Sequence, residues 1–181
     1  MSLKCVEDGQ EALTGKTGEI WIKGPNIFKG YYNNPKATAE ALTADGWYRT
    51  GDVGYVDEDH NLYITDRVKD LIKYNGFQVA PAQLEGLLLG HPAVNDVAVI
   101  GVYSQEKATE LPRAYIVAAA GYKAGPELEK VLCDWLHGKV APYKRLRGGI
   151  RFLDAVPKSA AGKLLRRVLV EEARKERTSR L

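Results

Sequence analysis

The sequence predicts an α+β fold, with a small mixed sheet and helices over residues 67–181 preceded by a short β-rich segment over residues 1–66. Short apolar runs separated by polar turns dominate the first segment, a pattern typical of strands. Beyond Asp66, windows with apolar residues three and four positions apart alternate with strand-like runs, which indicates helices packed on a sheet. The first segment lacks a comparable set of apolar residues, so we expect it to be part of something larger.

The first segment is expected to hold strands and one helix. Residues 19–24 form a short β-type run, and residues 52–55 and 62–65 read as two strands joined by the polar turn 57–61. Residues 35–42 predict one short helix between the run 19–24 and the strand 52–55.

The second segment begins with a predicted hairpin. Asn75-Gly76 lies between the apolar runs 68–72 and 77–79, and Asn-Gly in this setting is the strongest short hairpin signal. Pro81 then suits the first turn of a helix. His91-Pro92 ends that helix.

Two more helices and three strands complete the second segment. Residues 93–102 predict a buried strand paired with residues 114–119, and residues 150–153 a last strand. The helix starting at Pro126 and the terminal helix are each expected to present an apolar stripe, all on one side of the sheet. The stripes are Leu128, Val131, Leu132, Trp135 and Leu136, and Leu164, Leu165, Val168 and Leu169.

Charge is distributed unevenly along the 181 residues. The net charge is +3, yet residues 144–181 carry 12 Lys and Arg against 4 acids. A solvated face is the plain interpretation, and a nucleic-acid site is not expected because Phe152 is the only aromatic residue after Tyr143. No apolar run is long enough to span a membrane, and no Cys or His spacing predicts a metal site. Cys5 and Cys133 are expected to be reduced.

Four polar clusters are candidates for chemistry, and each alone has a plain structural interpretation. Asp52 follows Thr50-Gly51 at the mouth of a strand, where its carboxylate suits a diol such as ribose but turn chemistry explains it equally. In Asp66–Lys73, at least two of the cations Arg67, Lys69 and Lys73 could project from one strand face, or that face is simply solvated. The third cluster is the hairpin tip with Gln78.

The fourth cluster is Pro157-Lys158-Ser159-Ala160-Ala161-Gly162-Lys163. Lys163 follows small residues at the expected start of the terminal helix, where its ammonium could be delivered to phosphate oxygens. Alone, it is better explained as an exposed lysine at a helix start. The segment is not a Walker A loop, because Lys158 stands where the first glycine is needed.

In this order and spacing, the four clusters together resemble the adenylate-forming enzymes, which include acyl-CoA synthetases, peptide synthetase adenylation domains and luciferases. The resemblance runs from Gly18 to Arg167, through Gly30-Tyr31-Tyr32-Asn33-Asn34-Pro35. The stretch from Lys69 to Glu85 is most similar to 4-coumarate:CoA ligase and related phenylpropanoid or medium-chain acyl-CoA ligases.

The resemblance implies that ATP, as Mg-ATP, activates a carboxylic acid to an acyl-adenylate, and that CoA then accepts the acyl group. It implies residues 1–66 as the end of the N-terminal adenylation domain and residues 67–181 as a swinging C-terminal domain, with Asp66 at the hinge. It also implies roles for single residues: Lys163 as the catalytic lysine of adenylation; Asp52, Arg67, Lys69, Lys73 and Gln78 as nucleotide-binding; Asn75 and Gly76 as CoA-binding.

One residue departs from the family pattern. Asn75 stands where the coumarate ligases usually carry a lysine that contacts CoA, so a cation is lost there. The family's phosphate loop, acid pocket and adenine motif have no counterpart in these residues, so we expect the chain to be an inactive fragment of a longer ligase.

Two other interpretations stay open at this stage. The chain resembles a peptide synthetase adenylation domain less closely, and a non-catalytic module binding anions or a partner would also explain the basic end. Ser179-Arg180-Leu181 resembles a peroxisomal address and would recruit the import receptor; otherwise the protein is expected in the cytoplasm.

Overall fold

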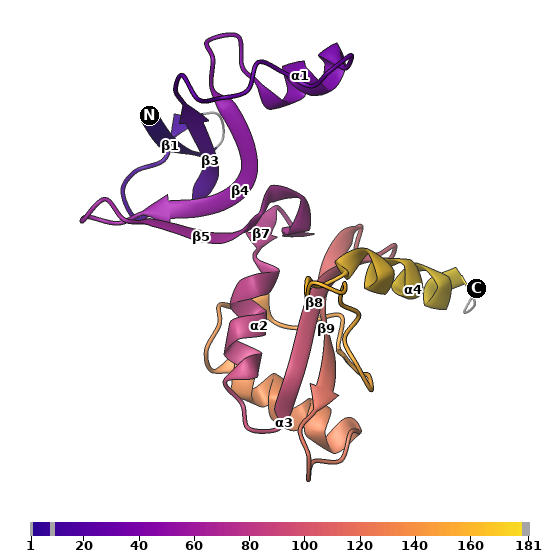
Figure 1. The fold of residues 1–181 in the computed structure, drawn as a ribbon. Helices are drawn as coiled ribbons and strands as arrows, with labels where there is room; N and C mark the ends of the chain where they lie inside the picture. The colour runs from indigo at the N-terminus through magenta and orange to yellow at the C-terminus, as the bar shows by residue number, and fades with distance from the viewer. Residues whose placement is uncertain (1, 8–9, 179–181) are drawn as a thin grey trace. The chain divides into compact units, whose positions relative to one another are not determined.

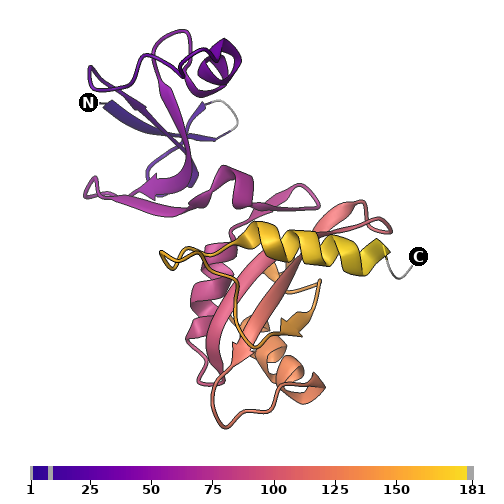
Figure 2. The same cartoon turned by 45° about the vertical axis from the view of Figure 1, so that its right-hand side comes forward.

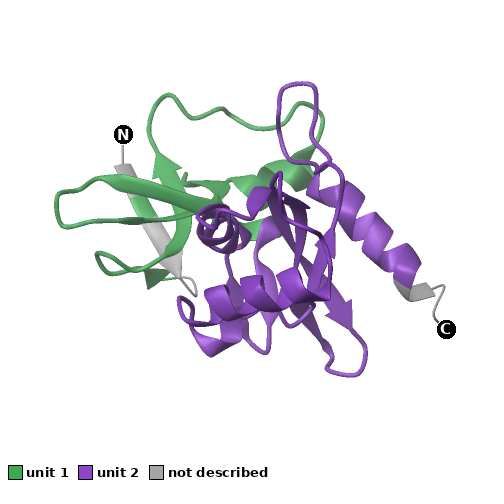
Figure 3. Ribbon diagram, turned by 90° about the horizontal axis from the view of Figure 1, so that it is seen from below, with its two compact units in different colours: residues 1–69 green, residues 70–181 purple. Residues whose placement is uncertain are grey.

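A computed structural model describes residues 2–7 and 10–178 of the chain. The chain divides into two compact units, Met1–Lys69 and Asp70–Leu181, drawn green and purple in Figure 3. Each unit is considered by itself below. The assignment of the two parts to an N-terminal and a swinging domain stays a prediction.

The first unit is built on an antiparallel sheet of strand order β2-β1-β3-β4-β5 (Figure 1). A helix, α1 (Pro35–Ala41), precedes β4, and Asn34 caps it by accepting a hydrogen bond from the Ala37 N–H at 3.0 Å. The predicted strands, turn and helix of this segment are confirmed. The strands are β1 (Ser2–Glu7), β2 (Gln10–Glu11), β3 (Gly18–Lys23), β4 (Tyr48–Val56) and β5 (Leu62–Arg67).

The second unit starts with the hairpin β6–β7 and continues into a mixed three-stranded sheet of order β10-β9-β8. β8 and β9 run antiparallel, whereas β10 joins β9 in parallel. The mixed sheet and its helices confirm the predicted fold class. The elements are β6 (Ile72–Tyr74), β7 (Phe77–Val79), α2 (Pro81–Leu89), β8 (Val94–Ser104), β9 (Thr109–Ala118), α3 (Pro126–His137), β10 (Ile150–Phe152) and α4 (Arg166–Thr178).

Helices cover both faces of this sheet, so the expectation of helices on one side was wrong. Side chains alternate along β8: Val97 and Val99 pack with α2 and α3, whereas Ala98 and Ile100 pack with Leu169 of α4. Figures 1 and 2 show α4 across one face and α2 and α3 behind the other. An apolar run such as Val97–Ile100 is what a strand buried on both faces requires.

Three local predictions need correction. The first arm of the hairpin, expected over residues 68–72, is a 3₁₀ turn at residues 68–70, and strand β6 begins only at Ile72. The Asp66 carboxylate accepts a hydrogen bond from the Arg67 N–H at 2.8 Å, a local bond that competes with ladder formation. Helix α4 begins at Arg166, and Val131 of α3 is 50% exposed, so the buried stripe of α3 narrows to Leu128, Leu132 and Leu136.

Candidate functional site

Asp52 and Arg67 lie opposite each other on adjacent strands of the first unit. They are register partners in the β4–β5 ladder, and Arg67 Nε lies 3.0 Å from Asp52 Oδ1. Both side chains stay accessible, at 27% and 50% exposure respectively. The pair therefore presents a carboxylate already oriented by a guanidinium, with a second oxygen available to a hydroxyl donor.

The backbone before Asp52 is shaped by its two neighbours. Gly51 has φ of +72°, a conformation that side-chain-bearing residues rarely adopt. The Thr50 hydroxyl donates to the Ile20 carbonyl at 2.7 Å and accepts from the Asp52 N–H at 3.0 Å. These bonds fasten the Asp52 backbone to β3, so the carboxylate sits on a sheet rather than on a free loop.

Asp66 and Lys69 also belong to the first unit. Asp66 pairs in register with Val53, and Lys69 lies exposed in the 3₁₀ turn. Since that turn ends the strand, Arg67 and Lys69 do not alternate along one strand as expected. The hinge role of Asp66 and the nucleotide role of Lys69 stay predictions.

The predicted hairpin tip of the second unit is confirmed. Asn75 and Gly76 have φ of +47° and +82°, as an Asn-Gly turn between two strands requires. Lys73 and Gln78 are register partners on β6 and β7, so their exposed side chains emerge on the same face of the hairpin. Gly76 leaves open space at the tip, because a Cβ there would meet no atom within 4 Å.

Two residues at the start of β9 fasten this hairpin from behind. Buried Thr109 donates through its hydroxyl to the Lys73 carbonyl at 2.9 Å and accepts from the Asn75 N–H at 2.8 Å. Glu110 accepts from the Lys73 N–H at 2.8 Å. The backbone that carries Lys73 and Asn75 is thus held by side chains more than 30 residues away.

Lys163 lies in a tight loop before α4, and not in the helix as expected. Gly162 has φ of +76°, and its N–H donates to the Ser159 carbonyl at 2.8 Å. The Lys163 N–H donates to Ser159 Oγ at 3.1 Å, and its carbonyl accepts from the Ser159 N–H at 2.8 Å. The backbone of Lys163 is therefore ordered, while its side chain is exposed and makes no ion pair within residues 10–178.

The predicted site residues fall into the two units. Asp52, Asp66, Arg67 and Lys69 belong to the first unit, and Lys73, Asn75, Gly76, Gln78 and Lys163 to the second. Of the predicted site residues in the second unit, the cations are Lys73 on the hairpin and Lys163 in its loop, and both are exposed.

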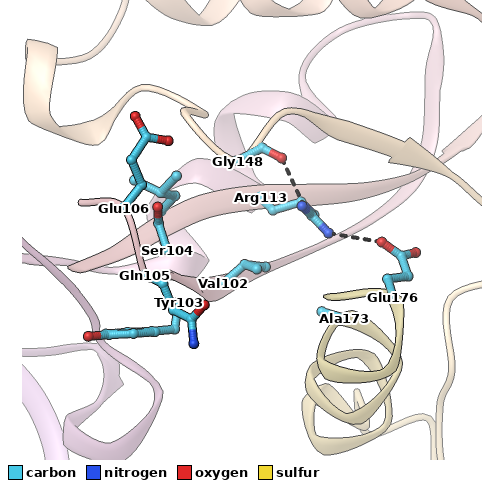
Figure 4. Close-up of a pocket in the computed structure, with 10 residues that line it drawn as sticks. Val102, Tyr103, Ser104, Gln105, Glu106, Arg113, Gly148, Ala173 and Glu176 are labelled. Carbon is cyan, nitrogen blue, oxygen red and sulfur yellow. Dashed lines mark hydrogen bonds and ion pairs between the residues drawn. The ribbon is translucent and has the colours of Figure 1, made fainter. Parts of the chain in front are cut away.

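The second unit also contains a pocket of about 340 Å³ that none of the predicted site residues lines (Figure 4). Arg113 crosses it, donating from Nε to the Gly148 carbonyl at 2.8 Å and from Nη1 to Glu176 Oε2 at 3.3 Å. Its walls come from the end of β8, the turn after it, the start of β9, the segment before β10, and α4: Val102, Tyr103, Ser104, Gln105, Glu106, Leu111, Gly148, Ala173 and Glu176. The guanidinium inside it is already bonded to protein groups.

No cluster of three or more His, Cys, Asp or Glu that could hold a metal ion occurs among the residues described. Over the same residues, none of the helices has the length and apolar character to cross a bilayer. Ser179, Arg180 and Leu181 lie outside the described residues.

The supporting residues of the site are the part that the sequence did not reveal. Thr109, Glu110, Glu85 and Asp96 hold the hairpin and the Lys163 loop through bonds that span 34 to 81 positions. A local pattern carries no signal for such pairs. In the sequence, each of these four is simply a polar residue inside or beside an apolar element.

Comparison with known proteins identifies what this arrangement resembles. Residues 83–163 match the AMP-binding enzyme C-terminal domain. A putative acyl-coenzyme A synthetase of Emericella nidulans is 49% identical over 96% of the chain and 31% of its own length. Probable 4-coumarate–CoA ligase 2 of Dictyostelium discoideum is 54% identical over 90% and 29%. Peroxisomal OPC-8:0-CoA ligase 1 of Arabidopsis thaliana is 46% identical over 91% and 29%.

A solved structure gives the same likeness. ATP-bound MatB from Rhodopseudomonas palustris matches with a TM-score of 0.84 and 34% identity, over 94% of this chain and 33% of that one. The chain thus spans about a third of the length of the relatives it matches.

Proposed function

The chain belongs to the adenylate-forming superfamily through its AMP-binding enzyme C-terminal domain, and we propose that the whole protein is an ATP-dependent acid–CoA ligase. The observation that carries this proposal is the identity of about half of the residues to named CoA ligases over at least 90% of the chain. The solvent-accessible Asp52–Arg67 pair and the ordered Lys163 loop provide the polar groups that such chemistry uses.

The first half-reaction joins the acid to the nucleotide. A carboxylate oxygen attacks the α-phosphorus of ATP, the bond to the bridging oxygen breaks, and pyrophosphate leaves. Asp52 accepts hydrogen bonds from the ribose hydroxyls, with Arg67 holding the carboxylate in place. Lys163 places its ammonium between the acid and phosphate oxygens, where a preorganised donor is worth about 3 kcal/mol of transition-state stabilisation. Lys69, Lys73 and Gln78 contribute further nucleotide contacts.

The second half-reaction transfers the acyl group to CoA. The thiolate attacks the acyl carbon and AMP leaves with the phosphate oxygen. Gly76 serves this step because a hairpin tip without a side chain lets the pantetheine arm pass close to the backbone. Asp66 acts as the hinge between the poses of the two half-reactions. The acid is of the phenylpropanoid or the medium-chain to fatty type.

The full-length protein tests this proposal directly. Purified enzyme is offered a panel of phenylpropanoid and fatty acids, and pyrophosphate release and acyl-CoA formation are measured separately. Lys163→Ala should lower pyrophosphate release by roughly 10²–10³-fold, the range seen when one such donor is lost. It should leave thioester formation from a supplied acyl-adenylate largely intact. Absence of any ATP- and CoA-dependent product across the panel would refute the ligase assignment.

The 181-residue chain provides a matched control. We expect it alone to form no acyl-CoA, because its relatives are about three times as long. Titrating it with ATP, CoA and an acyl-adenylate analogue separates the ligase from an anion-binding module, whose affinity would be high and would fall steeply with salt.

The proposed location is the peroxisome. It is supported by the terminal Ser179-Arg180-Leu181 and by the relative named as a peroxisomal ligase. A reporter carrying this tail should be imported, whereas the same reporter with Leu181 deleted should stay in the cytoplasm. Cytoplasmic signal from both would contradict the proposal.

A further inference from the structure

The loop that carries Lys163 is fastened by an ion pair at each end. We call residues 158–165 the lysine loop. At its beginning, Lys158 Nζ lies 2.5 Å from Asp96 Oδ2. Immediately after it, Arg166 Nη2 donates to both carboxylate oxygens of Glu85, at 2.8 and 2.7 Å. The lysine loop is therefore held by one charged contact at its beginning and by a second immediately after its end.

Both contacts lead to the same strand. Asp96 belongs to β8, and Glu85 of α2 accepts a hydrogen bond from the Val99 N–H of β8 at 2.8 Å. Because β8 is an edge of the three-stranded sheet, every second N–H along it points away from β9 and needs another acceptor. Glu85 meets that need and binds Arg166 with the same carboxylate, which ties the end of the lysine loop to the sheet.

Of the two ion pairs, Arg166–Glu85 is less exposed to solvent than Lys158–Asp96. Its side chains are 23% and 13% exposed, against 40% and 26% for Lys158 and Asp96. Less solvent means less screening, so this pair holds its geometry more strictly. Asp70 adds a second carboxylate 4.0 Å from Arg166 Nη1.

The position of Arg166 is unfavourable for a helix alone. Arg166 is the first residue of α4, where the helix dipole disfavours a positive charge. A cation there is stabilised by Glu85 and Asp70 instead. The contacts of Arg166 with Glu85 and Asp70 therefore fix the position at which the lysine loop ends. They are not explained by the stability of the helix.

We propose that Arg166, held by Glu85, is a positioning residue that sets where Lys163 stands. This inference rests on the proposed function, because it gives Lys163 an adenylation role. Lys163 and Arg166 are three positions apart in the sequence, so their Cα atoms lie at most about 11 Å apart even along an extended chain. Releasing Arg166 therefore displaces the lysine directly. A misplacement of about 1 Å costs a reaction roughly a hundredfold.

Half-reaction kinetics on the full-length enzyme test the proposal. Arg166→Gln and Glu85→Gln should slow pyrophosphate release roughly a hundredfold in kcat, with the KM for ATP nearly unchanged. Thioester formation from a supplied acyl-adenylate should stay within about twofold of wild type, and Arg166→Lys should recover part of the loss. Arg167→Gln is the matched control, since the Arg167 side chain is 90% exposed and, among the residues that the structure describes, its ion pair is with Glu171 of the same helix. Equal losses in both half-reactions, or no loss in either, would overturn the proposal.

Hydrogen exchange on the 181-residue chain gives a readout that does not depend on activity. The Lys163 N–H, which donates a hydrogen bond to Ser159 Oγ, should exchange faster in Arg166→Gln. Its exchange rate should be unchanged in Arg167→Gln. Unaltered protection in Arg166→Gln would overturn the positioning role even if the variant were slow. Lys163→Ala separates this failure from failure of the proposed function: if it adenylates normally, the function assigned to the lysine is wrong, whatever Arg166 does.

Discussion

Arg67 and Asp52 face each other across the β4–β5 ladder, with Nε 3.0 Å from Oδ1. Asp52→Asn keeps the side chain's shape and removes its charge. In the full-length enzyme we expect the KM for ATP to rise about tenfold, since a hydrogen bond to a charged group contributes about 1.5–3 kcal/mol. The midpoint of unfolding should hardly move, because an ion pair this exposed contributes under about 1 kcal/mol.

Asp59→Asn is the control for this substitution. Asp59 sits in the exposed turn of the same sheet, so the same change of charge should leave the KM for ATP unaltered. Equal KM values for Asp52→Asn and Asp59→Asn would exclude Asp52 from ATP binding.

Thr109 supports the hairpin tip from beneath. Thr109→Val keeps the shape of the side chain but leaves the Asn75 N–H and the Lys73 carbonyl without the hydroxyl that forms hydrogen bonds with them. We expect a loss of about 1–3 kcal/mol in the free energy of unfolding and faster exchange of the Asn75 amide. Thr109→Ser keeps both hydrogen bonds and should retain the slow exchange. Slow exchange in Thr109→Val would show that the hairpin does not depend on this hydroxyl.

Two glycines of the second unit should respond oppositely to alanine. A Cβ at Gly76 or at Gly86 would meet no atom within 4 Å, so sterics cannot separate them. Gly76 has φ of +82°, where alanine costs about 1–2 kcal/mol, whereas Gly86 lies in α2, where alanine gains up to about 1 kcal/mol. Urea unfolding of the 181-residue chain measures both. A change of the same sign in both variants would contradict the assignment.

Most of the fold could be predicted because its signals are local. Asn75-Gly76 between apolar runs, Pro81 and Pro126 at helix starts, and the leucine spacing of α3 each act within one element. The placement of α4 could not be predicted in the same way. The predicted stripe of this helix, Leu164, Leu165, Val168 and Leu169, does not say which face of the sheet it covers. In the structure Leu169 and Ala173 are buried against the face of β8 that carries Ala98 and Ile100.

The residues of the candidate site divide in the same way, into those with a local sequence signal and those without one. Asp52, Gly76 and Lys163 stand out by sequence context, because turns and glycines mark where a backbone comes near a ligand. Glu85 gives no such signal, because it is one acidic residue on a helix until Arg166, 81 positions later, folds against it. Long-range pairs depend on the register of the sheet, which the local pattern does not specify.

Cys133 should be a slow nucleophile in the folded protein. Burial raises the pKa of its thiol above the ordinary value of 9.0, and the nearby carboxylates of Glu129 and Asp134 raise it further. At pH 8 the thiolate fraction is therefore smaller when the chain is folded than when it is unfolded. Iodoacetamide labelling, followed by peptide mapping, should be slower at Cys133 in buffer than in urea, and its rate should level off at a higher pH in buffer than in urea. Equal rates in both media at pH 8 would contradict the raised pKa.

Asn75→Lys should strengthen CoA use at a small cost in stability. The tip of the hairpin is exposed, and a lysine there would restore the cation that the coumarate ligases carry. One charge-assisted contact to a phosphate corresponds to a roughly tenfold lower KM for CoA, and this gain should shrink as salt rises. Lysine tolerates the φ of +47° less well than asparagine, so the free energy of unfolding should fall by about 1 kcal/mol. Asn33→Lys is the matched control, because its φ of +50° imposes the same backbone cost outside the hairpin. If both variants change the KM for CoA equally, the contact at residue 75 does not exist.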